Sequence, residues 1–143
     1  MSTDVVLPPA SRWKRPWLAV IAGVVAHLGV STLLVYAVVI GGDALSAVIE
    51  PRRLEWIHRL NDTTSGGWLV LQAISLISGV ASGLVAIALS PPKSRIAIGV
   101  LLVLAVGTVF FAQLPSPRSV AVVAIWSLAT PVGLVLGAYL GRS

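Results

Sequence analysis

A histidine inside a long uncharged stretch is the residue of this sequence best suited to chemistry. His27 lies ten residues past Trp17, about 15 Å along a helix, and Ser31 follows one helical turn later. A histidine in that setting can relay protons or bind a metal ion or a substrate anion. The alternative is a neutral imidazole bonded to a serine or to Gln72 on a neighbouring helix. We favour this structural role, because the uncharged stretches contain no carboxylate to tune the imidazole.

Hydroxyl and amide side chains recur on one face of a second uncharged stretch. At 3.6 residues per turn, that face holds Gln72, Ser75, Ser78 and Ser82, together with small residues. Inside a membrane such groups bond to a neighbouring helix or line a polar path. Together with His27 and Ser31 they form the candidate intramembrane polar site.

Familiar catalytic arrangements are missing from the sequence. The chain has no cysteine, which excludes thiolate chemistry and thiolate metal ligands. It has no H-E-x-x-H motif, no second histidine in an uncharged stretch, and no carboxylate in the first stretch for cation-coupled efflux of the small four-span multidrug type. Ser75, Ser78 and Ser82 share no helix with a histidine that could activate them. We therefore expect no enzyme activity, no cofactor and no metal.

Four apolar stretches without Asp, Glu, Lys or Arg must position these residues. Of the 143 residues, 57% are hydrophobic and 10% charged, whereas soluble domains have about 45–50% apolar and about 25% charged residues. About 20 apolar residues cross a bilayer, and runs this long must be helical because lipid cannot hydrogen-bond the backbone. The sequence predicts an all-α integral membrane protein, a single domain of four transmembrane helices in an antiparallel bundle, at residues 17–40, 68–89, 96–114 and 120–140.

The basic residues indicate how the chain is oriented. The segment "RWKR" directly precedes the first stretch, and the side with both termini carries six Lys and Arg near stretch ends against four on the other. Positive charge favours the cytoplasmic side. We expect a cytoplasmic tail over residues 1–16, both termini in the cytoplasm, and a bacterial inner membrane as the location. The net charge of +5 fits a lipid surface better than nucleic acid.

The first loop, residues 41–67, contains the densest cluster of charge. Pro51 suits a first helical position, and apolar and polar residues separate onto two halves of a helix over about 51–61. We interpret this segment as a short amphipathic helix on the outer membrane surface. A surface that docks a partner is the alternative, and a catalytic site is the least favoured one. Its candidate partner or lipid contacts are Arg52, Arg53, Trp56, His58 and Arg59.

Glycines predict which helices meet. Close packing in lipid depends on small residues, and the second stretch has Gly79 and Gly83 on its serine face, while the fourth has Gly133, Gly137 and Gly141 at four-residue spacing. The first stretch has a similar face around Gly23 and His27. The third stretch has the weakest pattern of small residues, so we expect the first, second and fourth stretches to form the interior of the bundle. A "GLV" match between residues 83–85 and 133–135 is better explained by coincidence than by duplication.

Three functional hypotheses remain after these exclusions. The leading one is a multi-pass membrane protein without catalytic chemistry that assembles with itself or with a larger membrane complex. The second is a small transporter or channel subunit, in which the serine, glutamine and histidine side chains line a polar path. The third, a membrane enzyme that acts on lipid through His58 and Arg59, has the weakest support from the sequence.

Overall fold

The structure, a computed structural model, describes residues 16–46, 67–90, 95–113 and 120–142. These residues form four helices, α1 (Pro16–Ser46), α3 (Gly67–Leu89), α4 (Ile96–Gln113) and α5 (Val120–Leu140), and within these ranges there is no strand. The expectation of an all-α chain with four helices is confirmed. By length and composition, α1 and α3 could each span a membrane. The bundle arrangement and insertion into lipid stay predictions.

The helix bounds follow the uncharged stretches except at the end of the first one. The helix α1 continues past Ile40, where the predicted transmembrane stretch ends, through Gly41, Gly42 and Asp43 to Ser46. Each glycine weakens a helix by about 1 kcal/mol relative to alanine, but adding a turn to an existing helix avoids the cost of a new nucleus. The first six residues of the predicted loop are therefore helical.

The end of α3 is closed by a serine before two prolines. The Ser90 hydroxyl donates to the carbonyl of Ala86 at 2.6 Å, and the Ser90 N–H donates to the carbonyl of Ile87 at 3.2 Å. These bonds satisfy carbonyl groups that a helix end leaves without partners. Pro91 and Pro92 follow in the sequence and have no N–H with which to continue the ladder. Ser90 is buried, so this cap forms part of the packed end of the molecule.

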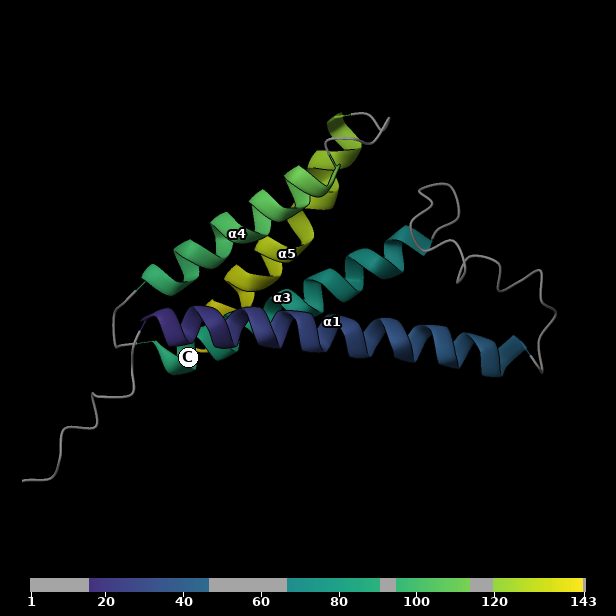
Figure 1. Ribbon diagram of the computed structural model, residues 1–143, viewed down its shortest axis with the longest axis horizontal. Helices are drawn as coiled ribbons and strands as arrows, with labels where there is room; N and C mark the ends of the chain where they lie inside the picture. Colours follow the sequence, from purple (N-terminus) through teal and green to yellow (C-terminus); the bar gives the residue numbers. More distant parts are fainter. Residues whose placement is uncertain (1–15, 47–66, 91–94, 114–119, 143) are drawn as a thin grey trace, which may run out of the picture.

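The helices converge at one end and diverge at the other (Figure 1). The start of α1, the end of α3, the start of α4 and the end of α5 lie together at the converging end. Neighbours along the chain are antiparallel, and α3 and α5 run in the same direction. From the shared end, the α4/α5 pair turns away from the α1/α3 pair, and α1 extends beyond the start of α3.

The buried core sits at the converging end. It consists of Ala86 from α3, Ile98 and Leu101 from α4, and Leu134 and Ala138 from α5, with Val20 and Val24 of α1 packed against it. The helix expected to be the least involved therefore supplies two of the five core residues. α4 still has a strongly exposed side, where Val103 is 73% exposed. The contact face of α4 is built from large aliphatic residues, so no pattern of small residues reveals it in the sequence.

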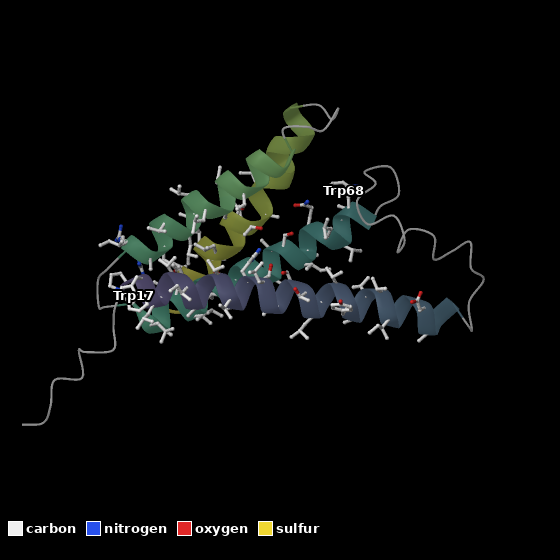
Figure 2. The ribbon with its side chains drawn as sticks, viewed as in Figure 1. Trp17 and Trp68 are labelled. Carbon is white, nitrogen blue, oxygen red and sulfur yellow. The ribbon has the colours of Figure 1, made fainter. Side chains whose placement is uncertain are left out.

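Large apolar side chains cover the outside of all four helices. Leu33 of α1, Leu69 of α3, Val103 of α4 and Leu128 of α5 are all exposed, and Figure 2 shows the side chains that project from the outer side of α1. An uncovered apolar surface of this extent is unfavourable in water. The chain therefore needs an apolar surrounding or a large partner surface.

Candidate functional site

The side of α3 that bears small residues is its buried side. Ser78, Gly79, Ser82, Gly83 and Ala86 are buried along this helix. Two neighbours share the surface of α3: α1 approaches the serines, and α5 approaches the glycines. Leu76 and Val80, the aliphatic residues three positions before these glycines, border α5 through their backbone atoms.

Four glycines hold α3 and α5 at backbone contact. A Cβ atom added to Gly79 would lie 2.5 Å from the backbone oxygen of Thr130, and one added to Gly83 would meet the oxygen of Leu134. From the other helix, Gly133 faces the oxygen of Leu76, and Gly137 faces that of Val80. No side chain fits at these positions. The glycine Cα–H groups therefore point at carbonyl oxygens of the facing helix, a weak hydrogen bond that recurs at close helix contacts.

This contact is internally symmetric. Gly79 and Gly133 are 54 residues apart in sequence, as are Gly83 and Gly137. The residues whose oxygens they face are also 54 apart, in the pairs Leu76/Thr130 and Val80/Leu134. Two parallel helices with G-x-x-x-G faces thus pair in register, as two copies of one helix would. Gly141 differs from these four, because its added Cβ would meet the Ile87 side chain of α3, at 3.3 Å, and no backbone atom of that helix within the three nearest contacts.

A second close approach joins α1 to α3 and α4. A Cβ atom added to Gly23 would lie 3.2 Å from the Ser82 hydroxyl oxygen and 2.7 Å from Leu101. Four residues further along α1, the half-buried His27 imidazole faces the backbone of Ser78. From Gly23 to His27 along α1, the facing residue of α3 moves back from Ser82 to Ser78. These two contacts fix the register of the antiparallel pair.

Most hydroxyl groups of the predicted polar site bond to their own helix. Ser31 donates to the Leu28 carbonyl at 3.1 Å, Ser75 to the Leu71 carbonyl at 2.9 Å, and Ser78 to the Ser75 carbonyl at 3.1 Å. Such local bonds satisfy a hydroxyl proton without a neighbouring helix. These three serines need no polar partner across the helix contact, so they do not by themselves indicate a hydrated path.

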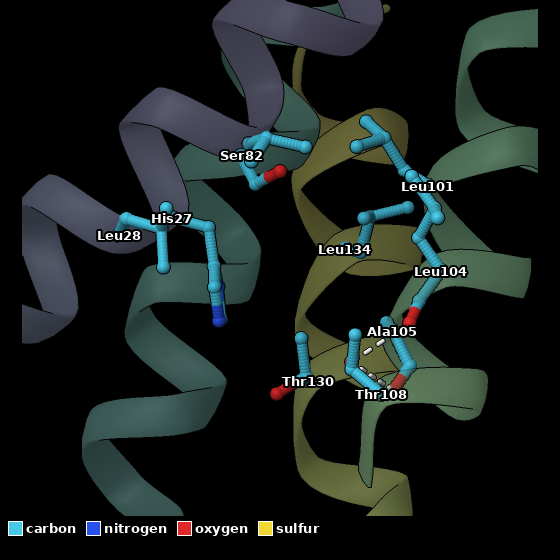
Figure 3. Close-up of a pocket in the computed structure, with 10 residues that line it drawn as sticks. His27, Leu28, Ser82, Leu101, Leu104, Ala105, Thr108, Thr130 and Leu134 are labelled. Atoms are coloured by element: carbon cyan, nitrogen blue, oxygen red, sulfur yellow. Dashed lines mark hydrogen bonds between the residues drawn. The ribbon is translucent and has the colours of Figure 1, made fainter. Parts of the chain in front are cut away.

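A pocket of about 340 Å³ lies between the helix pairs. All four helices line it, with His27 from α1, Ser82 from α3, Thr108 from α4 and Thr130 from α5 as the polar members. The remaining lining side chains are apolar: Val24, Leu28, Leu101, Leu104, Ala105 and Leu134. Figure 3 shows His27 and Thr130 extending from α1 and α5 toward the same level of this space. The described lining has no charged side chain.

Two buried polar atoms near this region have no hydrogen-bond partner within the described part of the chain. They are Nδ1 of His27 and Oε1 of Gln72. A bond between His27 and Gln72, one of the two kinds of partner expected for the imidazole, is not formed, because His27 faces Ser78, which is six residues further along α3 than Gln72. An unsatisfied buried acceptor costs about 1–3 kcal/mol. The Nδ1 atom is itself buried, so it does not open onto the pocket that other atoms of His27 line.

Comparisons with known proteins leave this geometry to be interpreted on its own. No protein-family model, curated protein or solved structure matches the chain. Among the residues with described positions, no group of three His, Cys, Asp or Glu side chains could hold a metal ion. The pocket and the glycine contact are therefore the two arrangements from which a function can be argued.

The structure joins only part of the predicted polar site to the pocket. Of its six residues, His27 and Ser82 line the pocket and the backbone of Ser78 faces His27, while Ser31, Gln72 and Ser75 lie elsewhere on α1 and α3. The predicted loop surface at Arg52, Arg53, Trp56, His58 and Arg59, with its amphipathic helix, lies outside the described residues.

Sequence reasoning did not assign the α4 side of the pocket. Leu101, Leu104, Ala105 and Thr108 recur at three- and four-residue spacing and line it together. The Thr108 hydroxyl donates to the Leu104 carbonyl at 2.7 Å, so its oxygen lone pairs remain as acceptors. The only available signal was Thr108 itself, one hydroxyl among aliphatic residues, which is too weak to identify a site.

Proposed function

We propose that this chain is a four-span integral membrane protein without catalytic chemistry, which acts by assembling with itself or with a larger membrane complex. The observation that carries the proposal is the exposed apolar surface on all four helices, with the α3 and α5 glycines turned toward each other. Aliphatic side chains outside and small residues at helix contacts are the arrangement that lipid favours.

The tryptophans support this placement in a bilayer. Trp17 is the second residue of α1 and Trp68 is the second residue of α3, and they lie near opposite ends of this antiparallel pair (Figure 2). Tryptophan is enriched at both membrane interfaces. α1 has 31 residues, about 46 Å of helix, which exceeds a hydrocarbon core of about 30 Å. With Trp17 at one interface, the exposed Asp43 lies beyond the other.

The common end of the helices supports an orientation with both termini in the cytoplasm. Arg95 before α4 and Arg142 after α5 are exposed at the end where α1 begins, and "RWKR" precedes α1 in the sequence. These residues place positive charge at one end of the helix group, as the positive-inside rule requires of a cytoplasmic face. A bacterial inner membrane is the corresponding location.

α1 presents the face best suited to assembly. Gly29, Leu33, Ala37 and Gly41 recur every fourth residue along it, and a Cβ atom added to Gly29 or Gly41 would meet no atom within 4 Å. This face lies on the part of α1 that extends toward the diverging end, so a helix of another chain can approach it closely. The glycines of α3 and α5 are not available in the same way, because they contact each other.

Native mass spectrometry of protein purified in nanodiscs tests the proposal. We expect oligomers or a stable complex from the wild type, and dissociation to the monomer in the variant Gly29→Leu, Ala37→Leu. Gly99→Leu on α4 is the matched control, since a Cβ atom there also meets open space. A wild-type protein found only as a monomer, or protein removed from membranes by carbonate washing, would contradict the proposal.

The transporter or channel hypothesis has less support. A polar path needs a row of hydroxyl and amide groups that face one continuous space, but of the predicted set only His27 and Ser82 line the pocket. The walls of the pocket are mainly aliphatic, which suits an apolar guest better than water or an ion.

A further inference from the structure

The pocket between the helix pairs has a closed floor and an open rim. Leu101 and Leu134 form the floor, where both are buried members of the core. Leu28 of α1 and Leu104 of α4 form the rim, where they are 58% and 45% exposed. Along α4, the step from Leu101 to Leu104 leads away from the converging end of the helices. The pocket therefore opens toward the diverging helix pairs, and its rim continues into the exposed apolar exterior.

The polar side chains of the lining present little that a polar guest could use. Nδ1 of His27 is buried, and Ser82 is buried as a whole. The Thr108 hydroxyl donates to the Leu104 carbonyl of its own helix. The described lining contains no Asp, Glu, Lys or Arg. A charged guest would lose its hydration and gain no counter-charge, which is strongly unfavourable. The guest that suits this pocket is therefore an uncharged hydrocarbon.

The size and depth of the pocket indicate which hydrocarbon can reach it. Its volume of about 340 Å³ is more than twice that of an apolar cavity of about 150 Å³, which stays dry and accepts a benzene-sized guest. At the rim, Leu28 lies eleven residues past Trp17, about 16 Å along the helix. With Trp17 at an interface, this is the middle of a hydrocarbon core about 30 Å thick, where the acyl chains of each leaflet end.

We propose that this pocket holds the methyl end of a phospholipid acyl chain, which enters between the diverging helix pairs and packs against Leu101 and Leu134. The inference rests on the proposed membrane location, because only a bilayer brings such a chain to the rim. It does not depend on whether the chain assembles with other chains. An unfilled space of this size would deprive its lining of dispersion contacts, and the acyl chain restores them.

Photolabelling of the wild-type protein tests the proposal directly. The full chain is reconstituted in phosphatidylcholine vesicles whose acyl chains carry a diazirine either at the methyl end or beside the carboxyl group. Light converts the diazirine to a carbene that inserts into adjacent side chains, and mass spectrometry locates the adducts. We expect the methyl-end probe to label Leu101 and Leu134 several-fold more than the carboxyl-end probe does. Leu33, exposed on the outer side of α1, is the reference for labelling by the surrounding lipid.

Two phenylalanine variants of α4 test the location. Ala105 lines the pocket, whereas Val103 is exposed on the outer surface. We expect Ala105→Phe to fill the pocket and lower the labelling of Leu101 and Leu134 several-fold, and Val103→Phe to leave it unchanged. Equal effects of the two variants, or equal labelling of the floor by the two probes, would overturn the proposal.

The reference residue separates failure of this proposal from failure of the membrane location. Label at Leu33 without label at Leu101 and Leu134 would reject the acyl chain in the pocket and leave the membrane location standing. Absence of label at Leu33 as well would reject both. The comparison of the two probes needs no variant, so it decides the case even if Ala105→Phe fails to fold.

Discussion

Gly79 of α3 and Gly133 of α5 lie directly against each other, such that a Cβ atom on Gly79 would be 3.2 Å from the Cα atom of Gly133. The helices that contain them are separated by α4 in the sequence, and they run in the same direction and pair in register. A parallel contact of this kind normally joins two identical chains. Here one chain supplies both helices, which leaves its other faces free for lipid or for partners.

The first prediction concerns the stability of this contact. Gly79→Ala should lower the free energy of unfolding by about 1–3 kcal/mol, the usual cost of overpacking, because the new methyl group meets the Thr130 backbone oxygen rather than a movable side chain. Unfolding in mixed detergent micelles, followed by circular dichroism, measures the change. Gly133→Ala should lower the free energy of unfolding in the same way. The loss in the double variant should be smaller than the sum of the two single losses, because both substitutions separate the same pair of helices.

The matched control for these variants is Gly29→Ala. A Cβ atom at Gly29 meets nothing within 4 Å, so only helix propensity changes, and the substitution should be neutral or stabilising by up to about 1 kcal/mol. If Gly29→Ala and Gly79→Ala shift the unfolding transition equally, the backbone contact between α3 and α5 is not the source of the effect.

The second prediction tests the parallel direction of α3 and α5. A Cβ atom on Gly141 would lie 3.5 Å from that of Ile87, within the range that a disulfide requires. The chain has no cysteine, so the double variant Ile87→Cys, Gly141→Cys should form one intramolecular disulfide on mild oxidation. Mass spectrometry of the digested protein detects it. Leu84→Cys with Gly141→Cys should remain reduced, and a bond in that pair instead would reject this register.

The sequence predicted the helices better than it predicted their contacts. Helix existence followed from charge-free runs of sufficient length, and all four starts and three of the four ends agree to within one residue. The small-residue face of α3 was also visible as a periodic pattern. The share of Leu76 and Val80 in the α5 contact was not, because backbone atoms make that contact and leave no signature in residue type. The "GLV" match aligns residues 50 apart, whereas the symmetric contact relates residues 54 apart.

The pocket could be predicted only in part, for a related reason. His27 was identifiable as the one ionisable residue in an uncharged stretch. The part of α3 that it faces depends on the register of α1 against α3, and Gly23 sets this register by fitting against Ser82 and Leu101. The wall formed by α4 consists of Leu and Ala residues that are as common on a lipid-facing surface. Only the divergence of the helix pairs turns them into the lining of a cavity.

The third prediction concerns the serines of α3. Ser75→Ala and Ser78→Ala should each change the free energy of unfolding by less than about 1 kcal/mol, because both hydroxyls donate within their own helix and interhelical bonds average about 0.6 kcal/mol in membranes. Ser78→Leu should be strongly destabilising, since Ser78 is 0% exposed. The same unfolding assay separates the cases. A large loss in Ser78→Ala would mean that this hydroxyl bonds across the helix contact.

The last prediction separates a lipid surrounding from water. Leu33 is 71% exposed on the outer side of α1 and lies sixteen residues past Trp17, about 24 Å along the helix. In water, Leu33→Lys would replace an exposed apolar side chain and increase solubility. In a bilayer, a lysine inside the hydrocarbon costs about 2.5–3.5 kcal/mol at the helix centre, less where its side chain reaches the interface. We therefore expect reduced membrane integration of Leu33→Lys, measured by glycosylation mapping of engineered acceptor sites, while Leu33→Ala integrates as the wild type does. Unchanged integration of the lysine variant together with recovery in the soluble fraction would rule out a transmembrane α1.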